Sequence, residues 1–212
     1  MNPFSYPTGR HIRNQTPSPF ADYRRFKPFL RTEFGRQCVY CRMPDGIQGE
    51  DHFGVDHYRP ASKFPALRCD YANLFYSCNA CNRRKGSFWP DDLETAQGLF
   101  IPNPCDHVMV EHLRFREAQV EALSPAGKLT EALLLLNDEE EISYRDFVLR
   151  LIERCLQDAE LVAENILELE RLKASAQEEE RESILVSLRE LREKLGLTQR
   201  DLERLTSLSF SP

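Results

Sequence analysis

Two pairs of cysteines constrain this chain more than any other feature. Cys38 and Cys41 form one C-x-x-C pair, and Cys78 and Cys81 form a second. The two-residue turn of such a pair lets both sulfurs face one ion, while backbone amides of the turn donate hydrogen bonds to the thiolates. Four thiolates at this spacing predict a closed, tetrahedral structural zinc site. A thiol-redox pair and cysteines buried in an ordinary core are the alternatives.

Polar residues near the two pairs indicate a second, open metal site. Asp56 and His57 lie between the pairs, and Asn82 follows the second pair directly. A carboxylate, an imidazole and an amide are the side chains that such a site uses. We therefore expect one ion to hold the module together and another to take part in chemistry.

The rest of the sequence favours a soluble, cytoplasmic protein. The other cysteines, Cys69, Cys105 and Cys155, are not paired and are expected to act as small apolar residues. Zinc-type rather than disulfide-type spacing favours a reducing compartment. Residues 1–13 contain no apolar stretch of the signal-peptide type, and the longest uninterrupted apolar run, residues 132–136, is far too short to span a membrane.

The charge is divided unevenly along the chain. The net charge is −6, but residues 1–90 carry 14 Lys and Arg against 7 Asp and Glu, or +7, and residues 91–212 carry 14 against 27, or −13. The basic part contains the cysteine pairs, where a local positive field would attract phosphate, and distant acidic charges are screened beyond roughly 8 Å at physiological salt. A merely solvated charge distribution is the alternative.

The residues before the first pair predict short helical segments. Ser18 and Pro19 supply an N-cap and a first-turn proline for a helix carrying aromatic residues, and Pro28 is expected to break or kink it. A second short turn over residues 29–34 ends at Gly35. The basic side chains of this region are expected to stay in solvent. They could either contact the DNA backbone or form an ordinary solvated face, and the sequence supports both equally. These basic residues are Arg24, Arg25, Lys27 and Arg31.

The segment between the cysteine pairs predicts a ββα unit. Residues 53–58 alternate as a strand does, and Pro60 ends that strand because it cannot donate to a ladder. A helix is expected to begin near Cys78 and to carry Asn82 and Lys85. Turn-forming residues in 98–110 mark the expected end of the module.

The remainder predicts a helical region. A long amphipathic helix is expected after Ser143, capped by that residue together with Asp146. Apolar residues then follow at alternating steps of four and three, and a similar series continues from Ile184 to Leu195. A helical hairpin that buries both series on each other is the favoured interpretation, and a stripe offered to a partner protein is the alternative. The expected fold class is α+β, with a basic helical extension (1–35), a ββα-metal module (36–110) and a helical C-terminal region (111–212).

Taken together, the motifs resemble those of the HNH endonucleases. The run is Cys38-x-x-Cys41, Val55-Asp56-His57-x-x-Pro60, Asn73-Leu74 and Cys78-x-x-Cys81-Asn82-x-x-Lys85-Gly86. It spans about residues 36–88 and implies a ββα-metal fold that cuts nucleic acid with one divalent ion. More loosely, residues 23–36 and 129–137 look like those of HNH effectors in prokaryotic anti-phage systems, including Septu and retron-associated types.

The resemblance implies a role for each matching residue. His57 matches the general base that takes a proton from the attacking water, and Asp56 and Asn82 match the ligands of the catalytic ion, Mg²⁺ or Mn²⁺. Asn73 matches the residue that braces the loop and fixes the orientation of the base. The cations just beyond, Arg83, Arg84 and Lys85, are expected to hold backbone phosphates.

The favoured function is therefore a DNA endonuclease of anti-phage defence, with a one-metal mechanism. RNA is an alternative substrate. A zinc-knuckle module that binds nucleic acid without cutting it is the second interpretation. The third is a nuclease active only in complex with a regulatory protein, such as an ATPase, that docks on the C-terminal helices. The same helices would allow homo-oligomers.

Overall fold

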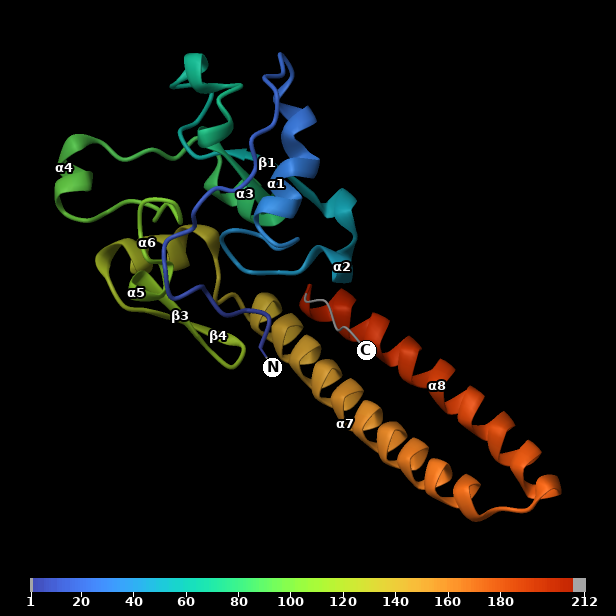
Figure 1. The fold of residues 1–212 in the computed structure, drawn as a ribbon. Helices are drawn as coiled ribbons and strands as arrows, with labels where there is room; N and C mark the ends of the chain where they lie inside the picture. Colours follow the sequence, from blue (N-terminus) through green and yellow to red (C-terminus); the bar gives the residue numbers. More distant parts are fainter. Residues whose placement is uncertain (1, 208–212) are drawn as a thin grey trace.

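The computed structural model describes residues 2–207 and has an α+β fold, as the sequence predicts (Figure 1). The α-helices are α1 (Lys27–Glu33), α2 (Asp45–Gln48), α3 (Asn79–Lys85), α4 (Asp92–Ala96), α5 (Met109–His112), α6 (Pro125–Leu134), α7 (Glu139–Ser175) and α8 (Glu178–Thr206). The strands are β1 (Phe53–His57), β2 (Leu74–Cys78), β3 (Leu113–Arg116) and β4 (Gln119–Ala122), and the 3-10 helices are η1 (Tyr23–Phe26), η2 (Glu50–His52), η3 (Pro65–Leu67) and η4 (Tyr71–Asn73). Within residues 2–207, no helix is both long enough and apolar enough to cross a membrane.

The expected ββα unit is present. Strands β1 and β2 pair antiparallel, with Asp56 opposite Phe75 and His57 opposite Leu74. Helix α3 follows β2 without a loop, because the sulfur of Cys78 caps it by accepting a hydrogen bond from the backbone N–H of Cys81. Every residue of β2 is buried, so this strand is the centre of the module.

The N-terminal helices begin later than expected. The side chain of Asp22, not Ser18, caps η1 by accepting a hydrogen bond from the N–H of Arg24. Pro28 does not break a helix but lies in the first turn of α1, where a backbone N–H has no intrahelical partner to lose. Phe26 and Leu30 are buried in the core beside β2.

Two long helices form a hairpin that extends from the body (Figure 1). Helices α7 and α8 pack along each other and bury Val148, Ile152 and Leu188, which confirms the expected hairpin. The predicted cap at Ser143 is wrong, because Asp138 accepts a hydrogen bond from the N–H of Glu140 and starts α7 one turn earlier.

Both ends of the hairpin are fixed to the body. At the root of α7, the fully buried Arg145 donates hydrogen bonds to the carbonyls of Ala118 (2.6 Å) and Leu136 (2.5 Å). The end of α8 returns to α2, where the backbone of Arg204 lies so close to Gly46 that an added Cβ would be 2.4 Å from the Arg204 carbonyl oxygen. The root of α7 is therefore tied to the β3–β4 turn and to the residues after α6, and the end of α8 lies against α2.

Candidate metal centre and HNH site

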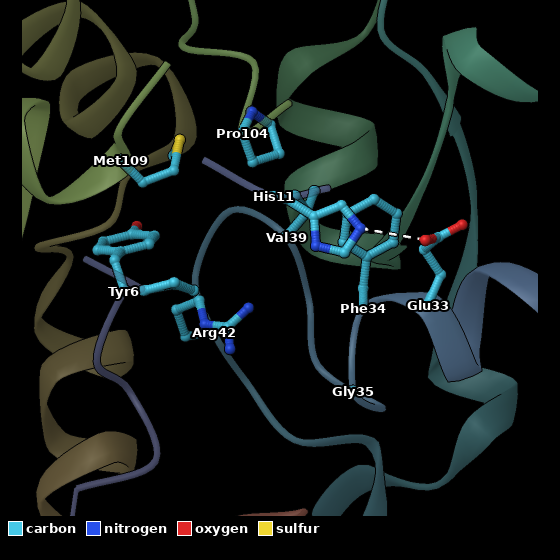
Figure 2. A pocket seen from close by; sticks show the side chains of 10 residues that line it. Tyr6, His11, Glu33, Phe34, Gly35, Val39, Arg42, Pro104 and Met109 are labelled. Atoms are coloured by element: carbon cyan, nitrogen blue, oxygen red, sulfur yellow. Dashed lines mark hydrogen bonds and ion pairs between the residues drawn. The ribbon is translucent and has the colours of Figure 1, made fainter. Parts of the chain in front are cut away.

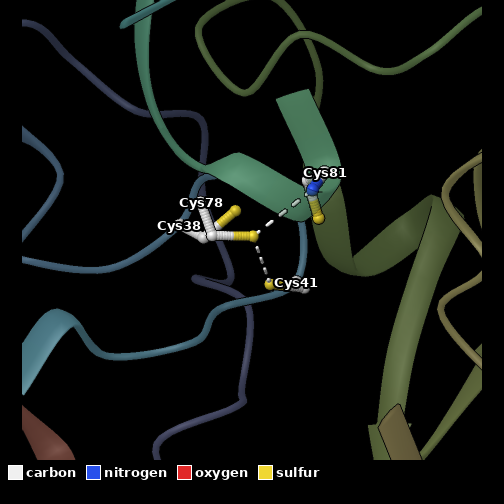
Figure 3. A group of neighbouring side chains, drawn as sticks. All are labelled: Cys38, Cys41, Cys78 and Cys81. Atoms are coloured by element: carbon white, nitrogen blue, oxygen red, sulfur yellow. Dashed lines mark hydrogen bonds between the residues drawn. The ribbon is translucent and has the colours of Figure 1, made fainter. Parts of the chain in front are cut away.

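The four predicted cysteines lie together (Figure 3). All four are buried, and their sulfur atoms all lie within 4.8 Å of one another. Cys38 and Cys41 come from the turn that follows α1, and Cys78 and Cys81 from the start of α3. Four convergent sulfurs match the donor set of a tetrahedral structural zinc ion, so the cluster can hold a metal such as zinc.

The thiols already interact strongly with one another. Burial alone would raise the pKa of Cys38, but hydrogen bonds from the other three thiols hold that pKa well below its ordinary value. The contact with Cys38 raises the pKa values of Cys41 and Cys81 well above the ordinary value. A thiolate at Cys38 that accepts hydrogen bonds from the neighbouring thiols places a negative charge inside the cluster, which favours binding of a cation.

Asp56 faces α3 and is buried. Its Oδ2 atom accepts a hydrogen bond from the hydroxyl of Tyr40 at 2.6 Å, and its Oδ1 atom lies 3.0 Å from Nζ of Lys85. The same ammonium donates to the carbonyl of His57 at 2.7 Å. Both carboxylate oxygens of Asp56 therefore have protein partners in this structure.

His57 lies on the other side of β1, because adjacent strand residues point to opposite faces. Its Nε2 atom is 2.9 Å from the carbonyl oxygen of Arg68. A carbonyl can only accept, so Nε2 carries the proton and Nδ1 keeps a free lone pair. The ring also contacts Tyr23, with centroids 4.6 Å apart. The imidazole is thus held in one orientation and one tautomer.

Asn73 connects the two ends of the loop that carries Arg68. Its Oδ1 atom accepts a hydrogen bond from the N–H of Arg59 at 2.8 Å. Its Nδ2 atom donates to the carbonyls of Arg59 at 3.0 Å and Leu67 at 3.3 Å. Since Leu67 precedes Arg68, the buried amide of Asn73 restrains the carbonyl that orients His57.

Asn82 lies on α3 against β1. Its Nδ2 atom is 3.4 Å from the carbonyl oxygen of Val55 and would be 3.8 Å from a Cβ built on Gly54. Gly54 and Asp56 share one side of β1, so Asn82 lies on the side of the Asp56 carboxylate. A carboxylate and an amide oxygen are hard donors of the kind that Mg²⁺ and Mn²⁺ prefer, and Asp56 already stabilises the positive charge of Lys85. The donor chemistry fits a hard divalent ion.

The three cations expected to hold phosphates do not share a surface. Arg83 is exposed. Arg84 donates to the Oε1 atom of Glu141 at 2.7 Å and to the carbonyl of Leu134 at 3.0 Å. Lys85 is 2% exposed, so its expected phosphate contact is contradicted by its position. Consecutive residues of a helix point in directions about 100° apart, which explains why the three side chains separate.

A separate cavity of about 210 Å³ lies near the N-terminus (Figure 2). Its polar lining includes Glu33, which accepts hydrogen bonds from the N–H of Asn14 (2.6 Å) and the hydroxyl of Tyr71 (2.7 Å) and contacts Nε2 of His11 at 3.2 Å. Burial acts to raise the pKa of Glu33, but these hydrogen bonds outweigh it, and the pKa is lowered. The carboxylate is therefore committed to holding the N-terminal segment on α1.

Sequence reasoning missed the contribution of Tyr40, Tyr23 and Arg68 to the site. Tyr40 lies inside the first cysteine pair, and no spacing in the sequence connects it with Asp56. Arg68 acts through its backbone carbonyl, which any residue possesses. Only Tyr23 carried a signal, as one of the aromatic residues of the helix predicted after Ser18 and Pro19.

Comparisons with known proteins agree with this geometry. The family model described as HNH endonuclease matches residues 38–88. The chain is 24% identical over 157 residues to the Septu protein PtuB of Bacillus thuringiensis, covering 70% of this chain and 58% of that protein. It is also 24% identical over 131 residues to the Septu protein PtuB of Bacillus mycoides (strain KBAB4), covering 50% of this chain and 44% of that protein. The chain thus spans about half the length of these relatives.

No solved structure matches the chain. The matched segment contains the four clustered cysteines together with Asp56, His57, Asn73 and Asn82. Residues 38–88 of this longer chain therefore match the HNH endonuclease family.

Proposed function

We propose that the protein is a metal-dependent HNH endonuclease that hydrolyses phosphodiester bonds of DNA and serves in prokaryotic anti-phage defence. The observation that carries the chemistry is the arrangement of His57, whose Nε2–H donates to the carbonyl of Arg68 and leaves Nδ1 free to accept a proton. The similarity to Septu proteins supports the role in defence.

His57 is the general base of this proposal. A neutral imidazole with a free ring nitrogen can accept a proton from water. Such a positioned base contributes about 10² to 10⁴ in rate. Asn73 acts as a positioning residue, because its hydrogen bonds restrain the loop whose carbonyl orients the ring.

Asp56 and Asn82 are the proposed ligands of the catalytic ion, Mg²⁺ or Mn²⁺. When bound, the ion would polarise the scissile phosphate and stabilise the leaving 3′ oxygen. The side chains themselves supply a carboxylate oxygen and an amide oxygen on the face of β1 opposite to His57. Expected products are 5′-phosphate and 3′-hydroxyl ends.

Plasmid cleavage tests the proposal. Supercoiled DNA should be cut with Mg²⁺ or Mn²⁺, and a DNA ligase should reseal the ends. His57→Ala should lower the rate by about 10² or more. The matched control is His52→Ala, since His52 is exposed and outside the site. Equal rates for His57→Ala and the parent chain would exclude His57 as the base.

Zinc is the proposed ion of the cysteine cluster. Cys81→Ser should lower the zinc content measured by metal analysis and destabilise the module, because structural zinc contributes folding energy directly. Cys155→Ser, which changes a half-buried cysteine of α7, is the control and should keep its zinc. Unchanged zinc in Cys81→Ser would exclude Cys81 as a ligand.

One observation favours a second candidate function. Lys85 already neutralises Asp56, and this contact favours a module that binds nucleic acid without cutting it. Duplex binding by a chain that cuts nothing with any divalent ion would support this candidate over the nuclease.

The hairpin supports a further proposal, a regulatory partner such as an ATPase. Leu161, Leu167 and Leu197 are exposed along it, and Arg84 joins the root of α7 to the helix that carries Asn82. Light scattering measures the mass of the chain alone and together with the co-expressed product of a neighbouring gene. A larger mass of the chain alone indicates homo-oligomers, and a larger mass only with the neighbour indicates a partner. A monomer unchanged by the neighbour would contradict both.

A further inference from the structure

Five exposed cations lie in the segments next to His57. They belong to η1 and to the loop between β1 and β2, and we refer to them as the cationic rim: Arg24, Arg25, Arg59, Lys63 and Arg68. None of the five forms an ion pair within residues 2–207, although other cations of the same region do. Lys27, for example, contacts Glu50, and Arg31 contacts Asp45. Neighbouring cations such as Lys27 and Arg31 are thus paired with carboxylates, whereas the cations of the rim have no carboxylate partner within residues 2–207.

Two rim arginines are held next to the proposed base by one aromatic ring. The guanidinium carbons of Arg24 and Arg68 lie 5.5 Å and 5.6 Å from the centroid of Tyr23. The ring of Tyr23 also contacts His57, with centroids 4.6 Å apart. A guanidinium stacked on a ring loses less side-chain entropy on binding and keeps its N–H edge available for a phosphate.

A second aromatic pair supports the other end of the loop. The guanidinium carbon of Arg59 lies 5.3 Å from the ring centroid of Trp89 and 5.8 Å from that of Phe64. Nζ of Lys63 is 3.4 Å from the carbonyl oxygen of Trp89. Because Asn73 binds the backbone of Arg59 and Leu67, the same amide that restrains His57 also fixes this part of the rim.

The two acidic groups of these segments, Asp22 and Asp70, cap short helices. The carboxylate of Asp22 accepts a hydrogen bond from the N–H of Arg24, and that of Asp70 from the N–H of Ala72. The strongly acidic part of the chain is the hairpin, where residues 138–206 carry 19 Asp and Glu against 11 Lys and Arg, or −8. The hairpin tip lies at the opposite end of the molecule from the rim (Figure 1). The five cations of the rim outnumber the two acidic groups of the same segments, so the segments next to His57 carry a net positive charge.

We propose that the cationic rim binds the phosphodiester backbone of duplex DNA, with Arg24 and Arg68 contacting the phosphates nearest to His57. This inference rests on the proposed function of the site. It assigns substrate binding to η1 and the β1–β2 loop, in place of Arg84 and Lys85. Backbone contacts of this kind position the strand without reading its sequence.

Fluorescence anisotropy with a labelled DNA duplex over a range of NaCl concentrations tests the rim. The chain carries His57→Ala so that the duplex stays intact. The rim variant adds Arg24→Gln and Arg68→Gln. The matched control adds Arg189→Gln and Arg200→Gln, which remove two exposed arginines of α8 and give the same net charge. Zinc content and thermal unfolding of each protein verify the fold.

Each phosphate contact contributes about 0.9 to the slope of log K against log salt for duplex DNA. The rim variant should therefore bind with a slope shallower by about 2 and with about tenfold lower affinity at low salt, while the control behaves as the parent. Equal slopes in the rim variant and the parent, equal losses in the rim variant and the control, or no duplex binding by the parent would each overturn the proposal. This assay measures binding without cleavage. If the rim variant shows the expected slope but the chain with His57 intact cuts no DNA, alone or with a partner protein, the rim stands and the endonuclease is refuted.

Discussion

The ammonium of Lys85 lies 3.0 Å from the Oδ1 atom of Asp56, and both residues are almost fully buried. Asp56 also accepts the hydroxyl of Tyr40, so the charge pair is hydrogen-bonded on both oxygens. Breaking such a buried pair by removing one partner costs about 3–5 kcal/mol. Lys85 therefore provides, in this structure, the positive charge that the proposed function assigns to a divalent ion.

Lys85→Met tests whether a divalent ion can take the place of the Lys85 ammonium beside Asp56. Without added Mn²⁺ the variant should unfold at a lower temperature than the parent, because Asp56 loses its counter-charge. Mn²⁺ should then raise the unfolding temperature of the variant more than that of the parent, as differential scanning fluorimetry would measure.

Arg83→Met is the matched control, since Arg83 is the exposed neighbour on the same helix. Equal Mn²⁺ shifts in Lys85→Met and the parent would contradict a shared position for the two cations.

Asn73→Ala tests the bracing of the base. The change removes all three hydrogen bonds of the buried Asn73 amide to the backbone of Arg59 and Leu67. A typical hydrogen bond contributes about 0.5–1.5 kcal/mol to stability, so urea unfolding should show a loss of about 1–3 kcal/mol. The turnover number for plasmid cleavage should fall as well, while zinc content stays constant.

Asn79→Ala, at an exposed position of α3, is the control. A stable Asn73→Ala protein with the turnover number of the parent would argue against a positioning role.

Local patterns explain which parts of this fold could be predicted. The cysteine cluster and the ββα unit follow from spacing over a few residues, and both are present. The β3–β4 hairpin was missed because its turn has no Gly or Asn signal. Glu117 adopts φ 53° there, a left-handed conformation that glycine or asparagine normally marks.

The side-chain partners of the site could not be predicted in the same way. That Lys85 points inward and Arg84 toward Glu141 depends on which face of α3 meets β1 and which meets α7. The sequence separation between Tyr40 and Asp56, 16 residues, carries no pattern. The segment boundaries at residues 35 and 110 stay predictions.

Glu33 predicts a pH dependence of stability. Its hydrogen bonds lower its pKa from the ordinary value of 4.5, so it contributes stability above pH 4.5 and loses this contribution as the pH falls through the lowered value. Glu33→Gln should therefore be less stable than the parent at neutral pH, and the difference should shrink as the pH falls below about 4.5. Urea unfolding at several pH values measures this difference.

Glu179→Gln, at an exposed position of α8, should differ little from the parent at any of these pH values. If the difference in free energy of unfolding between Glu33→Gln and the parent stayed constant down to the lowest pH at which the protein is folded, the titration of Glu33 could not be the cause of that difference.

Gly46 predicts how the hairpin is attached to the module. A methyl group at this position would lie 2.4 Å from the backbone carbonyl oxygen of Arg204, so one of the two backbones would have to shift. Gly46→Ala should therefore separate α8 from α2 or strain both, at a cost of about 1–3 kcal/mol.

Gln37 and Ser207 lie at the same junction, and the Nε2 of Gln37 donates to the carbonyl of Thr206 at 3.4 Å. Hydrogen exchange should accordingly rise in the last turns of α8, whereas Gly9→Ala, at a position with no atom within 4 Å, should leave exchange unchanged. Protection of α8 equal to that of the parent in Gly46→Ala would mean that the close approach of Gly46 and Arg204 does not hold α8 on α2.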